Sequence, residues 1–375
     1  MSILRVPVIL VTVIMLGIMV TGCATNSGGD AGLLKTSNAK AWSLKGTDDG
    51  MSIAVSPVRR TVQIAGASAA ILGAAFDAAA NSQYRSKIEG ALGDYNPGLV
   101  LEEHLKQRLV ETMGDSLEQV PPLTTTAGQK NQKDAEKARI QGLRRGGKQV
   151  VLDLKATYGI FGPEGTLVAK LDGNLIDVTT GKRVWSDAVL VSMEPILASA
   201  ALNDPTKTMA PNLSSPRLSA EKDAIDQWTG DGGARFKAEY EHSVKAVVSA
   251  LLCNLHMVRE AEGEYFLGKI AMNRKEFEVA EQHFKNAYAI DANMPDALNG
   301  VAANLGYQKD YEEAIAFGNK VAERFPDYAP IRLNLAWWYA VGQNDADSAR
   351  PHYEKALSLG LAPEPKIEKV LNKKQ

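Results

Sequence analysis

The last third of the chain repeats a pattern of small and aromatic residues every 34 residues, and no other feature limits the fold as strongly. Ala280 and Ala314 occupy equivalent positions in two successive units, and Ala349 follows in a third unit that is one residue longer between its helices. Small residues let helices pack closely and aromatic side chains fill the gaps, so the pattern predicts stacked pairs of helices. The three sets, in order, are Leu267, Gly268, Phe277, Ala280, Phe284 and Ala287; Val301, Ala302, Tyr311, Ala314, Val321 and Pro326; and Leu335, Ala336, Tyr339, Ala349, Tyr353 and Ala356.

This pattern resembles that of tetratricopeptide (TPR) repeats, most clearly in residues 311–315 and 354–357. Gly318 departs from the family pattern where an aromatic residue is usual, and Ala292 departs where proline is usual. The resemblance implies an α-helical TPR solenoid over residues 261–375, ending in a capping helix. The apolar stripe of that capping helix is Ile367, Val370 and Leu371.

In TPR domains the first helix of each pair lines a concave groove that binds partner proteins. The resemblance therefore implies a groove formed by Tyr265, Lys269, Asn273, Asn299, Ala303, Tyr307, Leu333 and Trp337. Trp337 is the expected anchor for a partner, because aromatic residues dominate the energetics of interfaces. The alternative is that Trp337 packs on a neighbouring segment. Lys269, Asn273 and Asn299 match only part of the lysine–asparagine clamp with which some TPR domains bind peptide carboxyl ends.

The amino terminus has the pattern of a secretory signal. Arg5 precedes an almost wholly apolar run over residues 6–20, which is too short for a comfortable membrane span. The run ends in Val20-Thr-Gly-Cys23, which resembles the bacterial lipobox and implies a signal peptide of residues 1–22 and acylation (palmitate) of Cys23. Ala24 after that cysteine resembles the rule for sorting to the outer membrane. The alternative to a lipobox is that the apolar run is a short buried strand, or that Cys23 is a chance cysteine after a plain signal peptide. Residues 23–49 are expected to form a lipidated tether.

Residues 50–260 read as an α/β or α+β domain, because strand patterns and amphipathic helix patterns alternate along them. Apolar and polar residues alternate before a proline in the first strand, and Leu and Met recur every three or four residues in the first helix. The predicted elements are strands at 51–58, 149–158, 167–178 and 183–191, helices at 98–120 and 236–258, and a turn at 179–182.

The hairpin over residues 175–185 carries the motif Asp-x-x-Thr-Gly-x-x-x-Trp, which resembles that of envelope α/β domains similar to the TolB amino-terminal domain and the curli-secretion lipoprotein. Asp177, Gly181 and Trp185 are interpreted as turn and packing residues. Two insertions are expected, at 62–97 and 194–233. The first contains small residues four apart over 62–80, typical of a buried or interface helix, with membrane insertion as the alternative; the second is rich in Pro, Ser, Asn and Asp and reads as a long loop.

Composition excludes several functional classes. A net charge of -2 argues against nucleic-acid binding, and two cysteines cannot form a disulfide framework or a four-cysteine metal site. Cys253 and His256 share a helix face without a second pair of ligands, so we expect no metal and no cofactor. Residues 130–148 hold seven Lys or Arg and two acids, and read as a solvated linker, with contact to anionic lipid or glycan as the alternative.

These patterns together predict a non-enzymatic lipoprotein of the cell envelope, anchored in the outer membrane and facing the periplasm. Its TPR groove would bind protein partners in envelope assembly, secretion or surface-polymer export. The main alternative is an oligomeric ring or pore-forming secretion component in which residues 62–80 insert into a membrane or line the assembly. A hydrolase with an unrecognised site is a third class, although no nucleophile or paired acid–base motif is present in the sequence.

Overall fold

The computed structural model describes residues 31–55, 81–114, 117–123, 132–162, 165–193, 196, 218–361 and 363–372. These residues form two compact units, a mixed α/β unit that ends at Phe266 and a helical unit that begins at Leu267. The boundary therefore falls a few residues after the predicted one at 260/261. The predicted signal peptide, Cys23 and the segment 62–80 lie outside the described residues.

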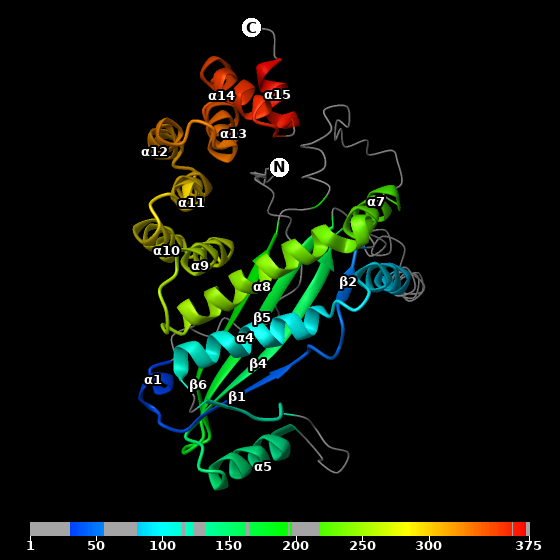
Figure 1. Ribbon diagram of the computed structural model, residues 1–375. Coiled ribbons are helices and arrows are strands. Elements are labelled where there is room, and N and C mark those ends of the chain that lie inside the picture. Colours follow the sequence, from blue (N-terminus) through cyan, green and yellow to red (C-terminus); the bar gives the residue numbers. More distant parts are fainter. Residues whose placement is uncertain are drawn as a thin grey trace, which may run out of the picture. The chain divides into compact units, whose positions relative to one another are not determined.

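The first unit is built on a mixed sheet with strand order β3-β1-β4-β5-β6, in which β2 also pairs with β4 (Figure 1). β4, β5 and β6 are antiparallel neighbours, whereas β1 runs parallel to both β3 and β4 and β2 runs parallel to β4. The sheet confirms a domain with both helices and strands. The strands are β1 (Lys40–Lys45), β2 (Ser52–Ala54), β3 (Leu117–Gln119), β4 (Val150–Phe161), β5 (Thr166–Asp177) and β6 (Lys182–Ser192).

β1 corrects the predicted tether of residues 23–49. All six of its residues pair with β4 and the first three also pair with β3, and Trp42 and Leu44 are buried. Removing the apolar surface of these two side chains from water stabilises the folded strand, and a solvated tether would lack this stabilisation. The folded domain therefore begins before residue 50, and the short helix α1 (Leu33–Thr36) precedes β1.

One face of the sheet is covered by α4 (Pro97–Met113) and α8 (Ala234–Asn254), which cross it in Figure 1. The predicted helix over 98–120 is too long. It ends at Met113 because Gly114 adopts a positive φ of 80°, and Leu117, which continues the apolar spacing, instead begins β3. Gly98 is required for the packing, because a Cβ atom there would lie 2.4 Å from the Thr47 carbonyl oxygen.

The opposite face of the sheet contacts α5 (Gln132–Arg145), so the prediction of a solvated linker over 130–148 is wrong for these residues. Arg139 on this helix binds Asp153 of β4, and Leu143 packs on a small apolar cluster that includes Val151 of β4. Val151 and Asp153 alternate along β4 with Leu152 and Leu154, which face α4 and α8. The linker was predicted from the high charge of this segment. α5 contacts the sheet through one ion pair and a few apolar residues, so its sequence carries only a weak apolar signal for a packed helix.

The described parts of both predicted insertions are largely helical, so the prediction of a loop is wrong for part of the second one. Residues 81–92 are helical, and α7 (Leu218–Thr229) falls inside the expected loop of 194–233. α7 buries Trp228, whose indole Nε1 donates a hydrogen bond of 2.9 Å to the Gly165 carbonyl. A turn of 3-10 helix, Gly230–Gly233, joins α7 to α8.

The predicted hairpin over 175–185 is formed by β5 and β6. The Asp177 carboxylate accepts hydrogen bonds from the hydroxyls of Thr179 and Thr180 at 2.6 and 2.8 Å, and Gly181 adopts a φ of 73°. Slight burial would raise the pKa of Asp177, but these hydrogen bonds hold it below its usual value. Trp185 is buried against Gly173, so the three motif residues form a turn and a packing contact.

The second unit consists of helices that pack in series, each on the next (Figure 1). Gly268 allows the first of these contacts, because a Cβ atom there would lie 2.6 Å from the Phe284 ring. The elements are the part of α9 (Ala261–Asn273) that begins at Leu267, then α10 (Phe277–Ile290), α11 (Pro295–Tyr307), α12 (Tyr311–Arg324), α13 (Ala329–Trp337), the π-helical turn η2 (Trp338–Gly342), α14 (Ala346–Ser358) and α15 (Pro365–Leu371).

The helical unit repeats in geometry as well as in sequence. The turns after α9, α11 and η2 each contain one non-glycine residue with positive φ: Lys275 at 64°, Lys309 at 67° and Asn344 at 57°. The first two are 34 residues apart and the last two are 35 apart. The π-helical turn η2 lies in the longer unit, so it accommodates the additional residue without shifting the helices that follow.

Candidate functional site

The residues that the sequence analysis assigned to a groove occupy equivalent positions 34 residues apart. Tyr265, Asn299 and Leu333 form one such series, and Lys269, Ala303 and Trp337 form another. Tyr265 groups with the first unit, where its ring meets that of Phe266 edge to face at 5.2 Å. The other positions belong to the helical unit.

Within the helical unit the predicted groove residues differ in their access to solvent. Asn273 is exposed, and Lys269, Asn299, Tyr307 and Leu333 are half-buried. The Asn299 side-chain oxygen accepts a hydrogen bond of 2.8 Å from the Nδ2 atom of Asn334, which joins α11 to α13. Burial raises the pKa of Tyr307, so its phenol is neutral at physiological pH.

Trp337 is not an exposed anchor. Its side chain is only 4% exposed and belongs to the apolar core of α11–α15. The ammonium group of Lys366 on α15 lies 5.2 Å from the centre of its ring, a cation–π contact. The structure therefore supports the alternative in which Trp337 packs on a neighbouring segment, and the exposed end of the predicted surface is at Asn273.

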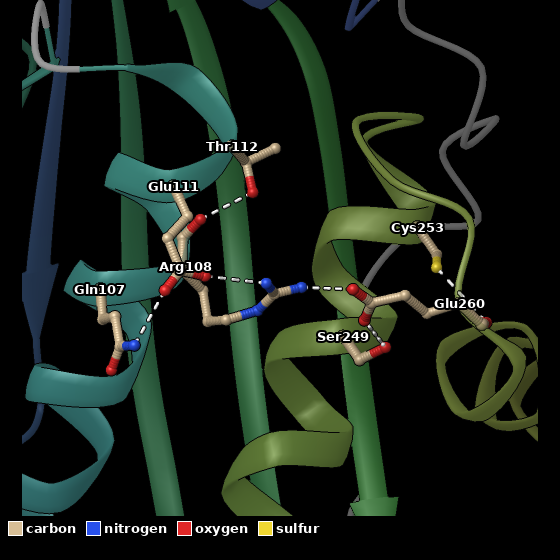
Figure 2. Close-up of polar contacts among 7 residues, drawn as sticks. All are labelled: Gln107, Arg108, Glu111, Thr112, Ser249, Cys253 and Glu260. Carbon is tan, nitrogen blue, oxygen red and sulfur yellow. Dashed lines mark hydrogen bonds and ion pairs between the residues drawn. The ribbon is translucent and has the colours of Figure 1, made fainter.

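A polar cluster that the sequence analysis missed lies in the first unit, where α4, α8 and the start of α9 meet (Figure 2). Arg108 on α4 forms ion pairs with Glu260 and, at 3.0 Å, with Glu111. The Ser249 hydroxyl donates a hydrogen bond of 2.6 Å to the second carboxylate oxygen of Glu260, and the Cys253 thiol donates to its backbone carbonyl at 3.8 Å. Arg108 and Glu260 are 152 residues apart, so no local pattern could have joined them.

The electrostatics of this cluster indicate a structural role. Burial alone would lower the pKa of Arg108, but its hydrogen bonds and charge contacts with Glu111 and Glu260 raise it. Burial raises the pKa of the Cys253 thiol to about 11, which leaves little of the reactive thiolate. A Cβ atom at Gly263 would meet both Cys253 and Ser249. The cluster therefore holds the first turn of α9 tightly against α8.

A shallow pocket of about 490 Å³ lies between α5 and the segment after β3. Apolar and small residues line most of it, including Val120, Pro122 and Ala135. Its two cations already have anionic partners within the protein: Arg139 binds Asp153, and Lys148 binds Glu118. The pocket is large enough for a small-molecule ligand, but both of its cationic side chains are already paired with carboxylates of the protein.

The described residues contain no cluster of three or more His, Cys, Asp or Glu side chains that could bind a metal ion. His256, which the sequence places near Cys253, is exposed and adopts a φ of 55° just after α8. Over the same described ranges, no helix combines the length and the apolar character needed to cross a bilayer.

Comparisons with known proteins leave the family open. No protein family and no curated protein matches the sequence. Among solved structures, the hypothetical protein CT253 from Chlamydia trachomatis aligns over 41% of this chain and 90% of its own, with 13% sequence identity and a TM-score of 0.19. A TM-score this low shows neither a shared fold nor a shared function.

Proposed function

We propose that the protein is a lipid-anchored outer-membrane adaptor that binds protein partners through a TPR groove in its helical unit. Acyl chains on Cys23 hold it at the membrane, facing the periplasm. Its binding events serve envelope assembly, secretion or surface-polymer export.

The observation that carries this proposal is the repetition of geometry in the helical unit. Positive φ angles recur at Lys275, Lys309 and Asn344, and small buried residues recur at Gly268, Ala302 and Ala336. Repeats of this kind build extended surfaces that bind protein segments. Asn273 is the exposed member of the predicted groove, and Lys269, Asn299, Tyr307 and Leu333 are half-buried, so Asn273 is the residue that would contact a partner first.

The groove is tested by photo-cross-linking in the native envelope. A photoreactive residue replaces Asn273, which is exposed on the first helix of a pair, and the control replaces Ala316, which is exposed on a second helix, α12. The proposal expects discrete protein adducts from position 273 and few from position 316. The same adducts from both positions, or none from position 273, would contradict it.

The anchor is tested by Cys23→Ser. Loss of the thiol removes the acylation site, so the variant is expected to lose the lipid label and to leave the membrane fraction after removal of loosely bound protein. A chain that keeps the lipid label after this substitution would refute the lipoprotein assignment, whatever the groove binds.

A further inference from the structure

The first unit gathers positive charge at one end of its sheet. α5 and the turn between β5 and β6 meet there, because the Arg144 guanidinium donates hydrogen bonds to the carbonyls of Val178 and Thr179 at 2.9 Å each. Figure 1 shows α5 beside this end of the strands. We call the cations there the basic surface: Lys133, Lys137, Arg144, Arg145, Lys148, Lys182 and Arg183.

The charge of the basic surface is accessible and only partly balanced. All of its members except Lys148 are exposed, and Lys148 pairs with Glu118. The carboxylates at the same end, Asp134, Glu136, Glu118 and Asp177, are fewer than the cations. The chain as a whole has a net charge of -2, so the excess of cations is a local property.

The positive charge continues onto the sheet face that α5 contacts. Lys45 of β1 and Lys155 of β4 are paired in register, share the face of Asp153 and are both exposed. Asp172 of β5 lies opposite Lys155 on its other side and also pairs with Lys170, so it offsets part of the repulsion between the two lysines; an anionic surface facing them would offset the rest.

The chain enters the sheet at this same end. Gln149, next to Lys148, accepts hydrogen bonds from the backbone N–H groups of Asn38 and Ala39 and donates its own N–H to the Ala39 carbonyl. Lys40 and Val150, the first residues of β1 and β4, pair with each other, and Val150 pairs with Asp177, the last residue of β5. α1 precedes β1 and buries Leu34, so the folded part of the described chain reaches back to Ala31, nine residues before the start of β1.

We propose that the basic surface docks on the anionic phospholipid head groups of the membrane that holds the acyl chains of Cys23. This inference rests on the proposed anchor, because the residues 24–30 between Cys23 and the folded domain can span at most roughly 25 Å and so keep the domain near the bilayer. Charges act on a membrane only within about one Debye length, roughly 8 Å at physiological salt. The bilayer therefore holds α5 and the β5–β6 turn at its surface.

The test uses the acylated full chain with a dye on an introduced cysteine. Gln141→Cys places the dye among the basic residues of α5 without removing charge, and Leu99→Cys, 47% exposed on α4, is the control on the opposite face. Cys253 is buried and its thiol pKa is raised to about 11, so it competes little for the label. Vesicles of phosphatidylcholine, with or without phosphatidylglycerol, carry a quencher on their head groups.

We expect anionic vesicles to quench the dye at position 141 more than zwitterionic ones, and salt to remove the difference. The dye at position 99 should respond little. Each Lys or Arg near an anionic surface changes the affinity about fivefold, so Lys137→Gln/Arg145→Gln/Lys182→Gln should weaken docking by roughly 100-fold. Lys106→Gln/Lys245→Gln/Lys320→Gln removes the same charge from exposed sites elsewhere and should leave quenching unchanged.

The proposal would be overturned if both kinds of vesicle quenched the dye at position 141 equally, or if anionic vesicles quenched that dye equally in the two triple variants. A response to soluble heparin with none to anionic vesicles would overturn the lipid assignment in favour of an acidic polymer. Flotation tests the anchor separately, because a chain that fails to float with zwitterionic vesicles is not acylated. In that case, quenching of the dye by added anionic vesicles still decides whether the basic surface binds anionic lipid.

Discussion

Arg139 shows how a single residue attaches a charged helix to a sheet. Its guanidinium binds both carboxylate oxygens of Asp153, at 2.6 and 2.7 Å, and it also approaches the Ser43 hydroxyl and the Pro121 carbonyl at 3.3 Å. The two charged side chains are only 14% and 19% exposed. A two-pronged ion pair shielded from water is stronger and more directional than a surface pair.

We expect Arg139→Gln to lower the free energy of unfolding of the first unit by about 1–3 kcal/mol, because Asp153 keeps its charge and loses its main partner. The control is Lys222→Gln, which breaks an exposed i,i+4 pair with Asp226 and should cost less than about 0.5 kcal/mol. Urea unfolding followed by circular dichroism measures both. If the two variants lose the same stability, the pair has no special role in holding α5.

At the scale of the element, η2 explains how the third repeat unit, which is one residue longer, keeps its helices in the same order and spacing as the other units. Its five residues form a π-helical turn between α13 and α14, and the Tyr339 ring within it stacks on His352 of α14 with 5.7 Å between ring centres. The Tyr339 hydroxyl also accepts a hydrogen bond of 3.3 Å from Asn319 on α12. A wider turn therefore places Tyr339 against two neighbouring helices.

Deletion of Val341, which is 40% exposed within η2, is expected to leave the helical unit folded, within about 1 kcal/mol of the parent, because the turn can revert to ordinary α-helix. Deletion of Ala303 in the regular helix α11 is the comparison. It rotates all later α11 residues away from their contacts and should cost more than about 3 kcal/mol. Similar losses from the two deletions would show that η2 does not act as an adjustable turn.

The elements that the sequence predicted well are those whose signal is local. The β5–β6 hairpin follows from alternation around the turn at 179–182, and the helices of the second unit follow from their 34-residue period. β1 was missed because its partner strands β3 and β4 lie far along the chain, 77 and 110 residues after Lys40. α5 was missed because its sequence is mostly polar and its contacts with the sheet are few. The cluster around Arg108 and Glu260 was missed because these two residues are 152 positions apart in the sequence. Trp337 was misassigned because its residue type does not reveal that Lys366 of α15 lies over its ring.

At the scale of the whole molecule, both units contain a half-buried histidine beside a cation. Burial lowers the pKa of His104 in the first unit and of His352 in the second, and Arg108 and Arg332 lower them further. Below their usual pKa of 6.5 the unfolded chain binds protons that the folded chain binds less well. Each unit is therefore expected to gain stability as the pH rises towards about 6.5 and to keep it above that value.

His352→Gln tests this in the helical unit. The variant cannot gain the proton, so its free energy of unfolding should rise less than that of the parent between about pH 5.5 and pH 7.5. Glu364, whose pKa burial raises, acts in the opposite direction and is present in both proteins, so it cancels in the comparison. Urea titrations at the two pH values provide the numbers, and an unchanged slope would mean that His352 does not contribute.

The position of β1 between β3 and β4 has a mechanical consequence. Any tension on the chain before residue 40 pulls β1 along its own axis, and the register from Lys40 to Lys45 places neighbours on both sides of its first three residues. Such a pull shears several hydrogen bonds at once, whereas an edge strand peeled from its end would lose them one at a time. A pull on the amino-terminal side of this domain therefore meets more resistance than a pull that peels an edge strand.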